Sequence, residues 1–195
     1  MLPPTGIHHV SALTNDVRTN HAFSTTVLGM RLVQRTVNQD DPSTYHRFDA
    51  DGAGTPGSDL TYVDMPRAAR ERRGTRSITR TTLRVDGETT LDAWRARFGS
   101  HGVPHGDVTH RRGRLHLDFE DPHALPLALV GDGGVGSAPP WDAGPVPAAR
   151  QVRGLGSVEI TVPELGPTHA FLTDVPHLEA EASWQRDAVR GNIHA

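Results

Sequence analysis

The sequence predicts an α+β fold built from repeated βαβββ modules. Three observations support this: residues 6–66 have the order strand, helix and three strands, residues 77–131 repeat that order, and a third copy begins near residue 153. The third copy shows the repetition most clearly, because GLGSVEITVPELGPTHAFLTDV from Gly154 aligns without a gap on GIHHVSALTNDVRTNHAFSTTV from Gly6. The chain therefore reuses one supersecondary unit.

The first module, residues 6–66, is marked by alternating apolar positions and by turn residues. Asn15 and Asp16 offer N-cap oxygens for a helix, and Gly29 stands where a helix-ending glycine belongs. We expect a strand at 6–14, a helix at 17–28, and strands at 30–38, 44–49 and 59–64.

The second module, residues 77–131, has the same signals. Its expected elements are a strand at 78–85, a helix at 89–100, and strands at 107–110, 114–118 and 125–130. Residues 132–152 are rich in Gly and Pro and are interpreted as a linker. Residues 153–195 are expected to form a partial third module with one strand and a short helix.

Composition limits the chemistry open to this chain. It has 195 residues, a formal charge of -3 and no Cys, and all of its basic residues are Arg. These features exclude disulfides, Cys nucleophiles and Lys chemistry, and they offer no general attraction for nucleic acid. No apolar run approaches the roughly 18 residues that span a membrane, so we expect a cytoplasmic protein without membrane or nucleic-acid partners. The 12 His are in surplus, and any transition-metal site must combine His with carboxylates.

Several motifs resemble one protein family over most of residues 6–175. They are GIHHV from Gly6, Thr36-Val37-Asn38, Asp40-Asp41-Pro42, Tyr45-His46, Gly54-Thr55-Pro56-Gly57, Leu60-Thr61 and RRGRLHLDFEDP from Arg111. The sequence resembles the vicinal-oxygen-chelate superfamily, also called the glyoxalase/bleomycin-resistance/dioxygenase family. Within it, the likeness is to ring-cleaving dioxygenases of the hydroquinone and catechol type.

The resemblance implies curled mixed sheets around one Fe(II) or Mn(II), with a small dihydroxylated aromatic ring and dioxygen as substrates. Such enzymes have four modules, and they take one metal-binding His from the first strand and a second His and a Glu from the fourth module. The fourth module is expected to be missing here. A chain with an incomplete site is expected to form a homo-oligomer that covers the open barrel.

Six residues of the first module are candidates for the site. The resemblance implies that His9 binds the metal, and that His8 and Ser11 beside it take part in catalysis, through proton transfer and orientation of bound oxygen. Asp59 begins the last strand of the module, near where glyoxalase-type relatives place a carboxylate ligand. Tyr45 and His46 are expected to contact substrate, and His9, His46 and Asp59 would form a facial metal set if all three point inward.

The repeats offer an internal comparison for the metal ligand. In the third copy, Ser157 stands in the place of His9 and Gly156 in the place of His8. In the second copy, Thr79 or Arg80 stands in the place of the metal ligand. Only the first module therefore keeps a candidate ligand.

Two other functions are compatible with these residues. A glyoxalase-like lyase or isomerase would complete its metal site within two modules or across a homodimer. A non-catalytic small-molecule binding protein, like the bleomycin-resistance proteins, would use the curled sheet as an apolar pocket and need no metal.

Overall fold

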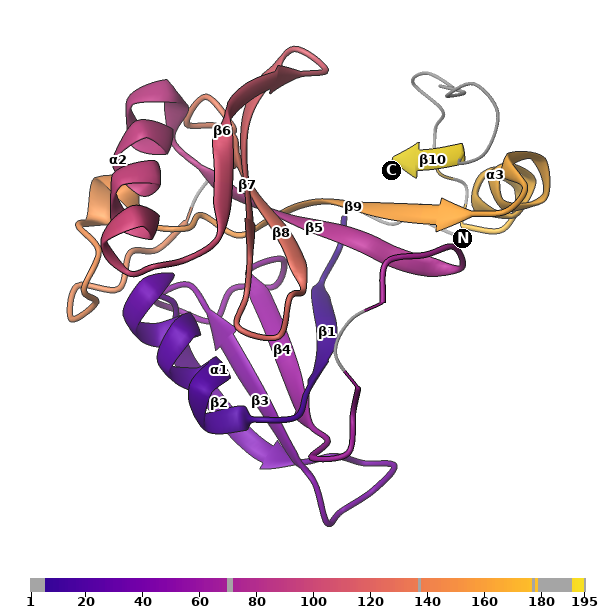
Figure 1. Cartoon of the computed structure of the whole chain (residues 1–195), viewed down its shortest axis with the longest axis horizontal. Helices are drawn as coiled ribbons and strands as arrows, with labels where there is room; N and C mark the ends of the chain where they lie inside the picture. Colours follow the sequence, from indigo (N-terminus) through magenta and orange to yellow (C-terminus); the bar gives the residue numbers. More distant parts are fainter. Residues whose placement is uncertain (1–5, 70–71, 137, 177, 179–190, 195) are drawn as a thin grey trace.

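The computed structural model describes residues 6–69, 72–136, 138–176, 178 and 191–194. The predicted α+β fold is confirmed: two mixed β-sheets carry helices α1 and α2, which lie near each other on one side of the molecule (Figure 1). The buried core is formed mainly where the helices cover the sheets. Its largest fully buried apolar side chains include Trp94, Tyr62, Phe98, Leu60 and Leu83.

The first sheet contains four strands in the order β1-β4-β3-β2. β1 pairs with β4 in parallel, and the other two pairs are antiparallel. The strands are β1 (His9–Thr14), β2 (Arg31–Val37), β3 (Tyr45–Ala50) and β4 (Asp59–Asp64).

The helix of the first module differs from the expected single α-helix at 17–28. α1 (Val17–Ala22) is capped by Asp16, whose Oδ1 accepts from the backbone N–H groups of Arg18 and Thr19 at 3.1 Å each. The chain then widens into a π-helical turn, η1 (Phe23–Val27). The Thr25 hydroxyl donates to the His21 carbonyl at 2.8 Å, a local bond that competes with regular helix geometry.

The second sheet has the order β10-β9-β5-β8-β7-β6. Its elements are β5 (Ser77–Val85), α2 (Gly87–Ser100), β6 (His105–Arg111), β7 (Arg114–Glu120), β8 (Pro126–Gly131), β9 (Leu155–Val162) and β10 (Gly191–His194), and α3 (Leu165–Asp174) follows β9. β9 pairs antiparallel with β5, so the third repeat extends the sheet of the second module. Residues 179–190 of the expected third module lie outside the described residues.

The segment interpreted as a linker is packed against both modules. Val146 and Val152 are buried, and the amide of Gln151 donates to the carbonyls of Trp141 and Val146 at 2.9 and 2.8 Å. The backbone N–H of Gly52 donates to the Pro139 carbonyl at 2.9 Å. We call residues 138–152 the clasp, because they join the first module to the second.

Candidate functional site

The first sheet has one face covered by α1 and one face on which the described part of the chain places no helix. Leu60 and Tyr62 lie fully buried on the covered face, so strand alternation places Asp59 and Thr61 of β4 on the other face. The strand register then brings further residues to that face. We call it the open face, and it contains His9, Ser11, Leu13, His46, Phe48, Asp59, Thr61 and Val63.

His9 and Asp59 lie opposite each other in the parallel register of β1 and β4. Asp59 is 9% exposed, and its Oδ1 is buried without a hydrogen-bond partner among the described residues. Burial raises the pKa of this carboxyl, while the nearby His8 and His9 act in the opposite direction. A buried carboxylate oxygen with a free lone pair beside an imidazole is a suitable pair of donors for a divalent cation.

The two histidines interact directly. Their Nδ1 atoms are 3.2 Å apart and their rings meet edge to face, with centroids 5.3 Å apart. One Nδ1 must carry the proton in this bond. When His9 carries it, the His9 Nε2 lone pair is free for a metal, as in sites where the second nitrogen of a ligating His donates to a neighbour.

A glycine-rich loop fixes the histidine pair. Asp51 Oδ1 accepts from the backbone N–H groups of Ala53 and Thr55 at 3.0 Å each. The chain then turns through Gly57, at φ 91, whose N–H donates to the His8 carbonyl at 2.7 Å. The Gly54-Thr55-Pro56-Gly57 motif therefore holds the start of β1 in place.

A chain of hydrogen bonds crosses the open face. His46 Nε2 lies 3.0 Å from Thr61 Oγ1, and the Thr61 hydroxyl donates to Ser11 Oγ at 2.8 Å. Sequence reasoning did not select Thr61 as a site residue. Thr61 follows Asp59 by two residues, as Ser11 follows His9. If β1 and β4 are assumed to pair in parallel, this spacing places Thr61 next to Ser11 and would have identified it as a site residue.

Tyr45 is not on the face that carries His46. It alternates with His46 and lies on the same side of β3 as the buried Arg47. Tyr45 is 49% exposed, and the guanidinium carbon of Arg35 lies 5.2 Å from the centroid of its ring. The structure therefore separates the two residues expected to contact substrate.

The facial metal set of His9, His46 and Asp59 does not form. Within the described ranges, no group of three His, Asp or Glu side chains is placed to hold a metal ion. The register explains this, because His46 lies opposite Val63, four residues or about 13 Å along β4 from Asp59. The residues on the open face fit two of the three positions of a 2-His-1-carboxylate site.

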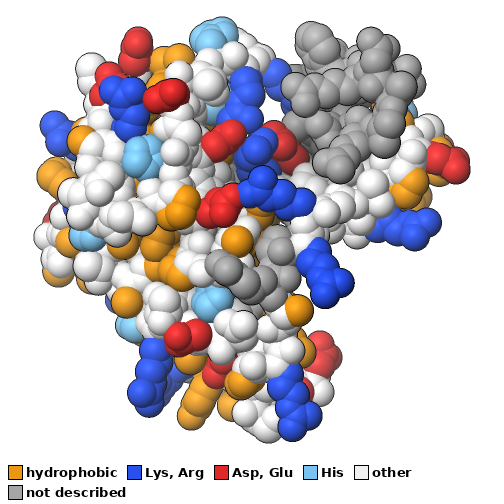
Figure 2. All heavy atoms as spheres, in the orientation of Figure 1, with side chains coloured by type: hydrophobic (Ala, Val, Ile, Leu, Met, Phe, Trp, Pro, Cys, Tyr) orange, Lys and Arg blue, Asp and Glu red, His pale blue; other side chains and the backbone are white. Residues whose placement is uncertain are grey.

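The corresponding face of the second sheet contains ion pairs instead. Arg80 pairs with Glu159 at 2.7 Å, and Thr82 Oγ1 lies 3.3 Å from the hydroxyl of Ser157. Asp118 pairs with both Arg80 and Arg111. Figure 2 shows basic and acidic side chains side by side over this part of the molecule.

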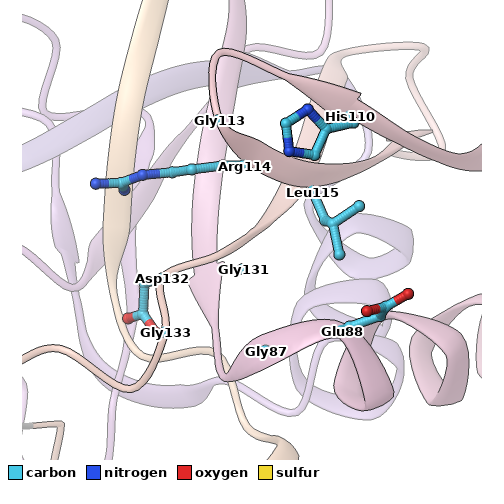
Figure 3. Close-up of a pocket in the computed structure, with 9 residues that line it drawn as sticks. All are labelled: Gly87, Glu88, His110, Gly113, Arg114, Leu115, Gly131, Asp132 and Gly133. Carbon is cyan, nitrogen blue, oxygen red and sulfur yellow. The ribbon is translucent and has the colours of Figure 1, made fainter.

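A shallow cleft of about 580 Å³ lies elsewhere, at the start of α2. Its lining consists of Gly87, Glu88, His110, Gly113, Arg114, Leu115, Gly131, Asp132 and Gly133 (Figure 3). None of the predicted site residues lines it. Asp132 is held by ion pairs with Arg84 and Arg153 at 3.3 and 3.1 Å, so its charge is already matched.

Among the described residues, the helices are too short or too polar to cross a membrane.

Comparisons with known proteins agree with the fold. A family model described as "Glyoxalase/Bleomycin resistance protein/Dioxygenase superfamily" matches residues 6–128. "Putative ring-cleaving dioxygenase MhqA" of Bacillus subtilis (strain 168) is 43% identical over 171 residues, which are 87% of this chain and 54% of that protein. "Chlorohydroquinone/hydroquinone 1,2-dioxygenase" of Sphingobium indicum is 25% identical over 179 residues, covering 90% of this chain and 56% of that protein.

A solved structure has the same architecture. The crystal structure titled "putative dioxygenase from Bacillus subtilis subsp. subtilis str. 168" matches with a TM-score of 0.85 and 29% identity, over 97% of this chain and 62% of that one. The chain spans about half the length of the curated relatives it matches. With the family model covering more than half of its residues, the chain belongs to the Glyoxalase/Bleomycin resistance protein/Dioxygenase superfamily.

Proposed function

We propose that this chain contributes the first-module half of the active site of a metal-dependent ring-cleaving dioxygenase acting on dihydroxylated aromatic rings. One observation carries the proposal: the buried Oδ1 of Asp59, which has no hydrogen-bond partner among the described residues, lies beside the His9–His8 pair. The matching relatives, named as ring-cleaving and hydroquinone dioxygenases, support the reaction class.

In this proposal His9 Nε2 and Asp59 Oδ1 would hold Fe(II) or Mn(II). The metal would supply Lewis acidity and a common binding point for the two substrates. His8 accepts or returns a proton at its ring nitrogen, and the Ser11 hydroxyl donates to a substrate oxygen. Phe48 and Val63 offer an apolar wall for the ring on the same face. The homo-oligomeric state and cytoplasmic location expected from the sequence stay predictions.

Metal binding by the purified chain tests the proposal. Titration with Mn(II), followed by the electron paramagnetic resonance signal of the free ion, is expected to show binding that His9→Ala and Asp59→Asn each weaken at least tenfold. His110→Ala, an exposed histidine of the second sheet, serves as the matched control and is expected to bind as the wild type. Equal binding by all four proteins would place the metal elsewhere and refute the assignment.

Oxygen uptake tests the reaction class separately. With Fe(II) and hydroquinone added, the wild-type chain is expected to consume dioxygen faster than His9→Ala. Hydroquinone binding without any uptake that depends on His9 would favour the non-catalytic binding protein.

A further inference from the structure

Three side chains from three different strands form one directed hydrogen-bond chain on the open face. Ser11 of β1 and Thr61 of β4 are partners in the parallel register, and His46 reaches Thr61 from β3. We propose that Thr61 is a positioning residue: its hydroxyl fixes the proton of His46 on Nε2 and leaves the Ser11 hydroxyl free to donate to a ligand oxygen beside His9.

The direction of the chain follows from the single proton of a hydroxyl group. Thr61 Oγ1 donates to Ser11 Oγ at 2.8 Å, so the 3.0 Å contact with His46 Nε2 must be one that Thr61 accepts. His46 Nε2 therefore carries hydrogen. Burial, followed by the charge of His9, lowers the pKa of His46 and favours the neutral ring with its second nitrogen unprotonated.

Burial protects this arrangement from water. Thr61 is 0% exposed, so solvent does not compete for its hydroxyl. The His46 ring also packs on Phe48, with centroids 4.3 Å apart and planes 35° apart, which restricts its rotation. Linked hydrogen bonds in such an environment polarise one another, so the donor at the end of the chain is strengthened.

The exposed end of the chain is Ser11. Its oxygen accepts from Thr61, and its own proton, which meets no acceptor among the described residues, lies on the side of the sheet that carries His9. The ligand atom that meets it must accept a hydrogen bond. Among the groups of a dihydroxylated ring, a deprotonated oxygen satisfies this best, since hydrogen bonds to charged acceptors are the stronger ones. Only this ligand step rests on the proposed function.

Nitrogen-15 NMR of the His46 ring in the whole metal-free chain tests Thr61 directly. The wild type and Thr61→Ser are expected to show the Nε2–H tautomer, and Thr61→Val is expected to show a mixture because the acceptor is gone. Thr36→Val is the matched control: Thr36 is the register partner of His46 on β2, and its hydroxyl makes no hydrogen bond with the described residues. A wild-type Nδ1–H tautomer, or a Thr61→Val spectrum like the wild type, overturns the proposal.

Anaerobic titration with hydroquinone tests the ligand step. Ser11→Ala and Thr61→Val are expected to weaken binding about three- to tenfold, while Thr61→Ser retains it. Unchanged binding in Ser11→Ala overturns the ligand step. A wild-type chain that does not bind hydroquinone contradicts the ligand step and the proposed substrate class together, whereas the tautomer result decides the role of Thr61 on its own.

Discussion

The Asp59 carboxylate is nearly buried, and one of its oxygens has no hydrogen-bond partner among the described residues. Burial raises its pKa, so the folded state holds the proton more tightly than the unfolded chain does. The free energy of unfolding therefore falls as pH rises from the ordinary value of 3.8 through the raised pKa of the folded state. A carboxylate suited to hold a cation thus lowers the stability of the metal-free fold.

Asp59→Asn is expected to stabilise the metal-free protein at pH 7 by about 0.5–2 kcal/mol, because it removes this charge. Urea unfolding at pH 7 and at pH 3.5 measures the effect, which should shrink at the lower pH. Asp64→Asn, at the other end of β4, is the control and should change little. A less stable Asp59→Asn at pH 7 would contradict the electrostatic explanation.

His116 in the second sheet makes the free energy of unfolding depend on pH in the opposite direction to Asp59. Burial, reinforced by the charge of Arg111, lowers its pKa to about 4, and its Nδ1 is buried without a partner among the described residues. The unfolded chain binds this proton more readily, so stability is lost as pH falls from 6.5 towards 4.

His116→Gln is expected to reduce that pH dependence, by at most about 3 kcal/mol over the interval. Chemical denaturation at a series of pH values between 4 and 7 gives the slope. The exposed His110→Gln should retain the wild-type slope, and the interpretation fails if His116→Gln retains it as well.

At the scale of elements, a buried arginine connects the helix of the first module to its sheet. Arg47 is 2% exposed and donates to Asp49 Oδ2 at 2.8 Å and to the Val17 carbonyl at 3.0 Å. It also binds the side chains of Asn20 and Ser24, which belong to α1 and the following π-helical turn. One guanidinium thus fixes the helix over β3, on the face opposite the candidate site.

Arg47→Leu is expected to destabilise the protein by about 3–5 kcal/mol, because the Asp49 carboxylate would stay buried without its partner. Adding Asp49→Leu should recover most of the loss. Guanidinium denaturation of the single and double variants measures both values. A double variant as unstable as the single one would mean that the helix contacts, rather than the buried charge, dominate.

Periodicity and turn residues were sufficient to predict most elements. The strand expected at 59–64 has those bounds in the structure, and the α2 helix lies within two residues of its expected start. The π-helical turn was missed, because periodicity and turn residues predicted one continuous helix at 17–28. The site was only partly predictable. Alternation along a strand is enough to place His9 with Ser11 and to separate Tyr45 from His46, but the alignment of Thr61 with Ser11 depends on pairing between strands.

At the scale of the whole molecule, the clasp of residues 138–152 was expected to be a simple linker. Gly and Pro content indicates where regular structure stops, but it does not show whether the segment packs. The clasp packs closely against the first module at Gly52, where an added Cβ would lie 2.1 Å from the carbonyl oxygen of Pro140. Only glycine allows the clasp to approach the first module this closely.

Gly52→Ala is expected to destabilise the chain by about 2–4 kcal/mol, because the backbone of the clasp must move. Thermal denaturation measures the loss, and trypsin cleavage at Arg150 should become faster as the clasp detaches. Gly106→Ala is the matched control, since a Cβ there has open space. A Gly52→Ala protein with wild-type stability and cleavage would show that the clasp contributes little.

The backbone of Gly57 connects two distant parts of the sequence. Its N–H donates to the His8 carbonyl and its carbonyl accepts from the Leu155 N–H, both at 2.7 Å. The two peptide groups that meet at Gly57 therefore link the backbone of the histidine pair to the first strand of the third repeat. A ligand that displaces His8 therefore also acts on β9 through Gly57, so the third repeat, in which Ser157 stands in the place of His9, contributes to the alignment of the two imidazoles.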